Sequence, residues 1–199
     1  MAKKEKSIKG TKTEKNLIVA YLAESAAYSR YSFYASQAEK EEYYPIQQIF
    51  LDTAANELRH AKVYFKHLGG GNIPVSIKVE AGIIGSTEQN LETAAHEELV
   101  EGSELYRKFA EVAKKEGFDE IAKHFTEIAE IEDSHRKRFL HYLKQVQDGT
   151  VWKRDHEIVW KCLVCGYEHT GKEPPEECPA CDHPRKHYMA MDYPYAPTE

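Results

Sequence analysis

Apolar side chains recur every three or four residues through four long stretches of the chain, which is the spacing of helices with one buried face. The pattern predicts helices over residues 13–40, 45–68, 87–116 and 118–147. Local signals agree with these limits: Ser86-x-x-Gln89 is typical of a helix N-terminus and Pro45 suits a first helical turn. The short turn at Gly117 makes the third and fourth helices antiparallel neighbours.

Charged side chains interrupt these apolar stripes at regular places. Seven positions, separated by steps of four and three, make up the fourth stripe: Ile121, Phe125, Ile128, Glu132, His135, Phe139 and Tyr142. The second stripe repeats the same pair as Glu57 and His60. A buried Glu and His cost on the order of several kcal/mol of folding free energy unless they are paired or coordinated. The stripes therefore predict partners for these side chains inside the bundle.

The chain also repeats itself. Glu24 on the first stripe precedes Glu57 by 33 residues, and Glu98 on the third precedes Glu132 by 34. Each half then reads as a helical hairpin that supplies a Glu and a Glu-x-x-His. The connection at 72–86 is long enough to travel the length of a bundle. These features predict a ferritin-like four-helix bundle with a long crossover between its second and third helices.

The two Glu-x-x-His motifs predict a site for two metal ions. Residues three apart share a helix face, and only His60 and His135 among ten histidines have a Glu three positions before them. With Glu24 and Glu98, they make four carboxylates and two imidazoles, the ligand set of di-iron and di-manganese carboxylate proteins. Oxygen ligands with imidazole suit iron or manganese, and the residues alone do not choose between them.

A fifth carboxylate and several aromatic side chains lie near these positions. Glu101 is in phase with Glu98, so it is either a further ligand or a side chain behind the ligands. Tyr28, Tyr31 and Tyr106 lie on or beside the stripes, where their hydroxyls could bond to ligand carboxylates. Three more histidines fall off the stripes and are interpreted as surface residues: His96, His124 and His141.

All four cysteines lie in a different kind of sequence. After residues 147–151 the helical spacing ends, so we expect one domain over 1–148 and a second over 152–199. Two C-x-x-C pairs, Cys162/Cys165 and Cys178/Cys181, are separated by twelve residues and predict a four-thiolate site for one iron or one zinc ion.

Composition narrows the class of protein. The 199 residues are 41% apolar and carry a net charge of −6, which disfavours nucleic acid as a partner. No stretch has the length of a membrane span, and the charged N-terminus does not resemble a signal peptide. With cysteines placed for metal binding, these features predict a cytoplasmic protein.

Together the two halves resemble rubrerythrin. The resemblance rests on Glu24, Glu57-x-x-His60, Glu98-x-x-Glu101 and Glu132-x-x-His135, followed by a rubredoxin-like C-x-x-C module, and it includes Gly82-Ile83-Ile84 and Cys165-Gly166-Tyr167. It implies a non-haem di-iron peroxidase that reduces hydrogen peroxide to water in oxidative-stress defence. It also implies a homodimer or higher homo-oligomer, supplied with electrons by a rubredoxin or an NAD(P)H-dependent reductase.

The resemblance further implies roles for individual residues. Glu57 and Glu132 would bridge the two irons, with Glu24 on one iron and with Glu98 and His135 on the other. Glu101 and His60 would exchange as ligands of the first iron, and Tyr31 and Tyr106 would support the ligands. The cysteine-bound iron would relay electrons to the di-iron site, between subunits of a head-to-tail dimer.

Three other functions fit parts of this pattern. A ferroxidase or iron-handling protein uses the same bundle, although it needs no cysteine module. An oxygen-activating oxygenase or desaturase would need a pocket for an organic substrate. A sensor or scaffold would hold zinc at the cysteines.

Overall fold

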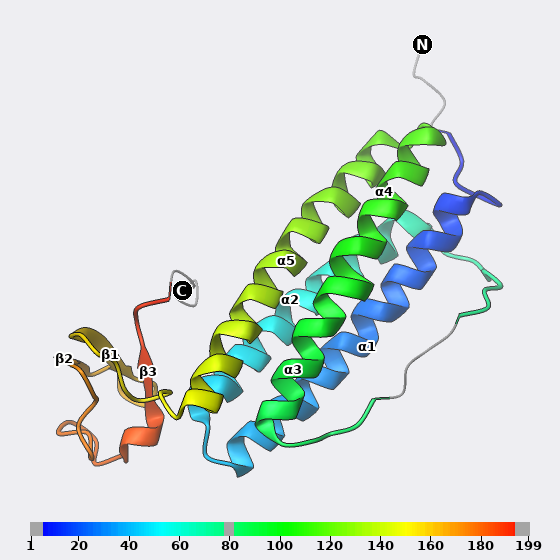
Figure 1. Cartoon of the computed structure of the whole chain (residues 1–199). Helices are drawn as coiled ribbons and strands as arrows, with labels where there is room; N and C mark the ends of the chain where they lie inside the picture. The colour runs from blue at the N-terminus through cyan, green and yellow to red at the C-terminus, as the bar shows by residue number, and fades with distance from the viewer. Residues whose placement is uncertain (1–5, 78–81, 194–199) are drawn as a thin grey trace.

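Helices make up most of the fold. The computed structural model describes residues 6–77 and 82–193, with only the backbone of Glu101. The chain forms a long helical bundle with a small sheet against one end (Figure 1). The helices are α1 (Lys12–Lys40), α2 (Tyr44–Leu68), α3 (Thr87–Glu97), the π-helix η1 (Glu98–Glu104), α4 (Leu105–Lys115) and α5 (Asp119–Asp148). The prediction of a mainly helical bundle is confirmed.

Local chemistry fixes the helix ends much as the sequence predicts. The Thr11 hydroxyl accepts a hydrogen bond from the Glu14 amide at 3.1 Å, and Ser86 and Gln89 form a full capping box on α3. Gly69 ends α2 at φ 65°, a left-handed conformation that glycine adopts without steric cost.

The crossover joins opposite ends of the bundle. It leaves α2 at one end and enters α3 at the other, beside α1 (Figure 1). In its described part the carbonyl of Ile83 accepts a hydrogen bond from the Tyr34 hydroxyl at 3.3 Å. The crossover topology predicted from the length of this segment is therefore present.

Two apolar clusters occupy the bundle interior. One contains Tyr31, Phe50 and Phe139, and the other contains Tyr64 and Phe125. On α2 and α5 the predicted ligands Glu57 and Glu132 fall between members of the two clusters. The apolar core thus holds the polar site at mid-height and keeps it out of bulk water.

The sequence pattern predicts one continuous α-helix for the third helical rod, but the structure divides this rod into three segments. At Glu98–Glu104 it becomes a π-helix, which takes one extra residue into a turn and so shifts the buried face by one position. After this segment the fully buried residues are Tyr106, Ala110 and Ala113. The apolar spacing of the sequence instead predicts Leu105, Phe109 and Val112 as the inward-facing residues, each one position earlier.

The C-terminal module contains three antiparallel strands. They are β1 (Ile158–Cys162), β2 (Glu168–Gly171) and β3 (Tyr188–Ala190), in the order β2-β1-β3, with a short 3-10 helix, η2 (Arg185–His187), before β3. Its core is small: Ile158, Trp160, Cys162, Cys178 and Tyr188.

Stacked rings attach the module to the bundle. Tyr43 stacks on Trp152 with ring centroids 5.7 Å apart, and Tyr44 stacks on His187 at 3.8 Å. Lys186 forms an ion pair with Glu42 beside them. Within the described part of the chain, none of the helices is long and apolar enough to span a membrane.

Candidate metal centres

Four helical rods bring six of the predicted ligands into one buried cluster. Two overlapping groups result, in which all ligand atoms lie within 4.8 Å of one another. One group is Glu24, Glu57, His60 and Glu132, and the other is Glu57, Glu98, Glu132 and His135. The structure therefore has two adjacent positions for a metal ion, each with three carboxylates and one imidazole.

Glu57 and Glu132 belong to both groups because each gives one oxygen to each side. Glu57 places Oε2 3.0 Å from His60 Nδ1 and Oε1 3.0 Å from His135 Nδ1. Glu132 places Oε1 3.0 Å from His60 Nδ1 and Oε2 2.8 Å from His135 Nδ1. Two carboxylates that face both groups have the arrangement required of bridging ligands.

The remaining two carboxylates close the ends of the cluster. Glu24 Oε2 lies 3.7 Å from His60 Nδ1, and Glu98 Oε1 lies 3.7 Å from His135 Nδ1. Each therefore belongs to one group, as a terminal ligand would.

Several buried atoms in the cluster have no hydrogen-bond partner. They are Glu24 Oε1, Glu57 Oε1, both oxygens of Glu132 and His135 Nδ1. Burying such groups without partners costs folding free energy, so these atoms indicate bound ions that replace the missing hydrogen bonds. The ligand residues and these unpaired atoms fit two metal ions.

The titration behaviour of the cluster agrees with this interpretation. Burial, together with the charges of Glu132 and Glu57, raises the pKa of Glu24 and of Glu98 well above the ordinary value. Burial opposes the charged form of His135, yet the charge of Glu57 and the closely placed carboxylate oxygens of Glu132 and Glu57 raise its pKa. Without metal, protons on these groups offset the crowded negative charge.

Polar neighbours orient the ligands. The Tyr31 hydroxyl donates a hydrogen bond to Glu98 Oε1 at 2.7 Å. The Tyr106 hydroxyl is buried beside Glu24, and burial with this charge raises its pKa, so it stays protonated. His135 Nε2 lies 3.1 Å from Asn56 Oδ1, which fixes the ring so that Nδ1 faces the carboxylates.

Two sequence expectations near the site have other outcomes. Tyr28, which the sequence places on or beside a buried stripe, is 39% exposed on α1. The backbone of Glu101 lies in η1, but its side chain is outside the described part of the structure, so its predicted role is untested. Asn56 was missed, since an acceptor for His135 has no signature in sequence spacing.

Gly102 also lies against a ligand, and the sequence pattern did not predict this contact. A Cβ atom there would lie 2.7 Å from Cγ of Glu132 and 2.9 Å from its Cβ, closer than such atoms approach. The π-helix thus brings its backbone against the side chain of a shared ligand. Glycine leaves the space that Glu132 occupies.

We expect Gly102→Ala to displace Glu132. The substitution should lower the free energy of unfolding by about 1–3 kcal/mol, as overpacking of a core does, and lower the metal content of the bundle. Thermal unfolding and metal analysis measure the two effects, with the exposed neighbour Glu104→Ala as the control. Full metal content with unchanged stability would contradict the packing argument.

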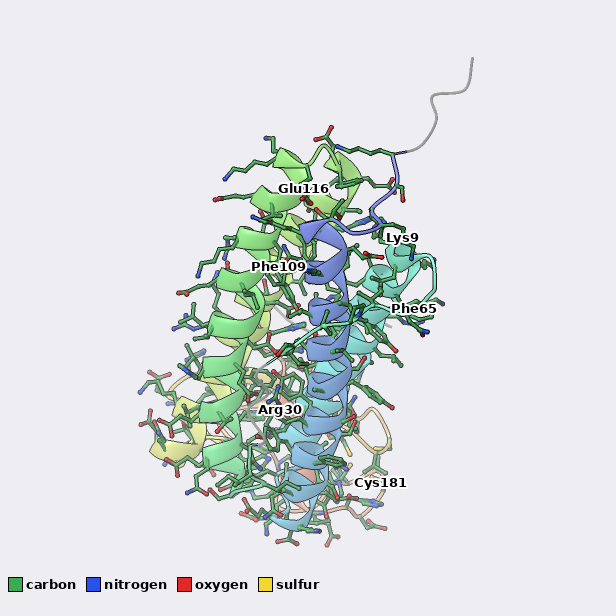
Figure 2. The ribbon with its side chains drawn as sticks, turned by 90° about the vertical axis from the view of Figure 1, so that its right-hand side faces the viewer. Lys9, Arg30, Phe65, Phe109, Glu116 and Cys181 are labelled. Atoms are coloured by element: carbon green, nitrogen blue, oxygen red, sulfur yellow. The ribbon has the colours of Figure 1, made fainter. Side chains whose placement is uncertain are left out.

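A small cavity adjoins the carboxylates. Its volume is about 20 Å³, room for one or two water-sized molecules, and it is lined by Glu24, Tyr31 and Glu132 among others. Arg30, about midway along α1 in Figure 2, forms an ion pair of 2.5 Å with Glu97 at its lining. The cavity leaves room for a small molecule beside the carboxylates.

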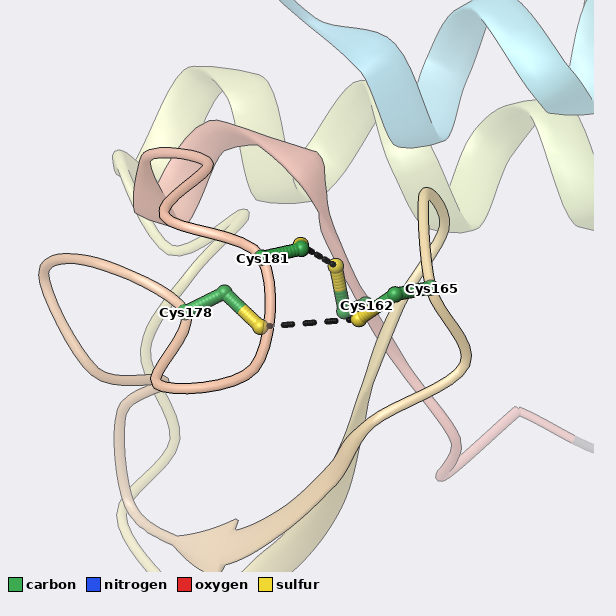
Figure 3. Close-up of side chains that lie close together, drawn as sticks. All are labelled: Cys162, Cys165, Cys178 and Cys181. Atoms are coloured by element: carbon green, nitrogen blue, oxygen red, sulfur yellow. Dashed lines mark hydrogen bonds between the residues drawn. The ribbon is translucent and has the colours of Figure 1, made fainter.

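The four cysteines converge at one end of the sheet (Figure 3). Cys162 Sγ lies 3.8 Å from Cys181 Sγ, and Cys165 Sγ lies 3.7 Å from Cys178 Sγ. Thiolates at about 2.3 Å from a tetrahedral ion are about 3.8 Å apart. The observed separations fit one metal ion at the centre.

One thiol of this group is already acidic without metal. Burial opposes ionisation of Cys178, but the nearby Tyr188 hydroxyl and the Ala180 amide lower its pKa to about 6. A thiolate is the form that binds metal, so the fold prepares this ligand in advance.

Comparisons with known proteins agree with both centres. The sequence model of the rubrerythrin family matches residues 15–143, and that of the rubrerythrin rubredoxin-like domain matches residues 160–189. The chain is 49% identical to rubrerythrin of Porphyromonas gingivalis, over 94% of this chain and 93% of that protein. It is 43% identical to rubrerythrin of Nitratidesulfovibrio vulgaris, over 94% and 97%.

Among solved structures, fully reduced nigerythrin superposes with a TM-score of 0.62 at 29% identity, covering 96% of this chain and 91% of that one. A bacterioferritin of Desulfovibrio desulfuricans, 23% identical with a TM-score of 0.57 over 68% of this chain and 82% of that one, shows the shared ferritin-like fold. With its di-iron carboxylate site and its four-cysteine site, the chain belongs to the rubrerythrin family.

Proposed function

We propose that the chain is a peroxidase that reduces hydrogen peroxide to water. The observation that carries this proposal is the pair of adjacent ligand groups that share Glu57 and Glu132, with a small cavity beside them. Two ferrous ions held there would supply the two electrons that one peroxide consumes as its O–O bond breaks and two protons complete two waters.

The protein's own groups position the ligands and keep the site dry. Glu24, Glu98, His60 and His135 close the ends of the cluster, and Glu101 is proposed as the ligand that exchanges with His60. Tyr31 holds Glu98 through the hydrogen bond from its hydroxyl. Because burial and the nearby carboxylates raise the pKa values of Tyr31 and Tyr106, both hydroxyls keep their protons and remain hydrogen-bond donors.

The cysteine module is proposed to supply electrons for repeated turnover. A redox-active iron at the four thiolates would do this, whereas zinc would not. Within one chain the module meets α2 at Tyr44, thirteen residues before Glu57, or about 20 Å along the helix. This separation supports delivery from a second copy, in a homodimer or higher oligomer, with a rubredoxin or an NAD(P)H-dependent reductase as the external donor.

Metal loading of the bundle should release protons. Without metal, His60, His135, Glu24 and Glu98 all have raised pKa values and so favour their protonated forms. Two divalent ions need these ligands deprotonated, so up to four protons should leave per pair of ions, and affinity should rise with pH. Calorimetric titrations in buffers of different ionisation enthalpy count the protons. Release near zero would contradict the assigned protonation states.

A ferroxidase or iron-handling role is the second candidate, because the ferritin-like fold is shared with a bacterioferritin. Steady-state assays with an artificial reductant separate the two. A peroxidase should consume hydrogen peroxide faster than dioxygen and store no iron, and it should run as a small oligomer on a sizing column. Rapid iron(II) oxidation with mineral formation in a large assembly would support the other function instead.

A further inference from the structure

The small cavity beside the carboxylates lies between α1 on one side and η1, with the helix ends next to it, on the other. Glu57 and Glu132, the two carboxylates that face both ligand groups, form part of its lining. A molecule in this cavity therefore touches the side chains that both metal positions share. The way into the cavity is then the way to the metals.

Solvent approaches this cavity along one face of α1. Ala23, Ala27 and Arg30 line the cavity and are half-buried, and their spacing of four and three residues places them on one side of the helix. Every other lining residue within the described part of the chain is buried. The cavity is therefore closed on the sides of α2 and α5 and reached from the side of α1.

The backbones of α1 and η1 leave a gap at this place. In the described part of the chain, α1 approaches α3 before η1 and α4 after it, but its backbone hardly contacts η1 itself. The α1 residues that face the gap, Ala23 and Ala27, have side chains too short to fill it. A π-helix is frequent at functional sites, and here it forms the wall opposite these alanines.

An ion pair closes one end of this gap. Arg30 reaches from α1 to Glu97, the last residue of α3, with 2.5 Å between nitrogen and oxygen (Figure 2). The next residue on each side, Tyr31 and Glu98, forms the hydrogen bond of 2.7 Å described above. Two neighbouring links thus tie α1 to the third helical rod, and the ion pair is the more exposed of the two.

We propose that small oxidants reach the metal positions through this gap, over Ala23 and Ala27, and that the ion pair of Arg30 with Glu97 limits its width. The proposal rests on the proposed function only for the identity of the natural oxidant. Any other small ligand of the bundle metals takes the same path. Nitric oxide, which binds ferrous ions, is therefore a suitable probe.

Stopped-flow measurement of nitric oxide binding to the reduced, iron-loaded protein tests this path. Ala23→Leu and Ala27→Leu should each slow association by about fivefold or more, because the larger side chain fills the gap. Dissociation should slow by the same factor, so the affinity stays unchanged, as a hindered passage requires. Ala26→Leu, the same change at an exposed position of α1, is the matched control and should leave both rates unchanged.

Replacing both members of the ion pair, Arg30→Ala together with Glu97→Ala, should speed association and dissociation. The double variant leaves neither charge without the other, and it lengthens the gap at its closed end. Metal analysis and thermal unfolding check each variant. If one leucine variant loses its iron, the other leucine variant and the double variant decide.

The proposal is overturned if both leucine variants hold their iron and bind nitric oxide as fast as Ala26→Leu does. It is also overturned if their affinity falls while dissociation is not slowed, since the metal site and not the passage has then changed. The peroxidase proposal is tested separately. Protein that takes up nitric oxide through the gap but does not react with peroxide would support the path and contradict that function.

Discussion

Replacing Glu132 by alanine is expected to empty both metal positions of the bundle while the cysteine-bound ion stays at full occupancy. Glu132 gives one oxygen to each ligand group, so its loss removes a ligand from both positions at once. It also removes one of the two carboxylates that face both His60 and His135, so that Glu57 alone still faces both. Peroxide turnover should fall by more than about 100-fold, beyond the 10–100-fold typical when a residue that only supports a ligand is lost.

The measurement is metal analysis combined with peroxide turnover. Glu130→Ala, an exposed carboxylate two residues earlier on α5, is the matched control and should keep both properties. If Glu132→Ala retains two ions in the bundle, the shared-ligand role is wrong, whatever happens to the rate.

Replacing Cys178 by alanine is expected to empty the cysteine site and to leave the metal positions of the bundle occupied. The cysteine-bound ion should be lost, because three thiolates no longer complete the tetrahedron that the 3.7–3.8 Å separations indicate. The bundle should keep its metals, since the two sites share no ligand. Steady-state peroxide reduction, with electrons supplied by a rubredoxin or an NAD(P)H-dependent reductase, should fall at least about tenfold. One oxidation of chemically pre-reduced bundle metals should proceed at the wild-type rate.

Val164→Ala is the control for this variant, because Val164 lies between two ligands but is 47% exposed. Rapid mixing of reduced protein with peroxide separates the single oxidation from repeated turnover. If steady-state turnover in Cys178→Ala equals that of the control, the module does not supply the electrons.

Sequence spacing identified the side chains that gather in the bundle because they follow helical periodicity. Glu57, His60, Glu132 and His135 are each placed by one helix face, and burial among apolar residues made their charge conspicuous. The cysteine site was predictable for a similar reason, since short knuckles keep both members of each pair together. In both cases the spacing within a local element already fixes the geometry.

Features that depend on contact between elements were not predictable. The π-helix moved the buried face from Leu105 to Tyr106, a shift of one residue that periodicity cannot anticipate. Asn56 faces His135 across two helices, and Gly102 faces Glu132 in the same way. The contact of His67 with His124 likewise arises only when α2 and α5 pack together.

Two metal ions bound by the carboxylate cluster are proposed to reduce hydrogen peroxide. Anaerobic titration of the fully reduced, iron-loaded protein with hydrogen peroxide, followed by the absorption of each metal site, tests this proposal. One peroxide per pair of bundle irons should complete their oxidation within the mixing time of each addition. A bundle that stays reduced, or oxidises only slowly in excess peroxide, would contradict it.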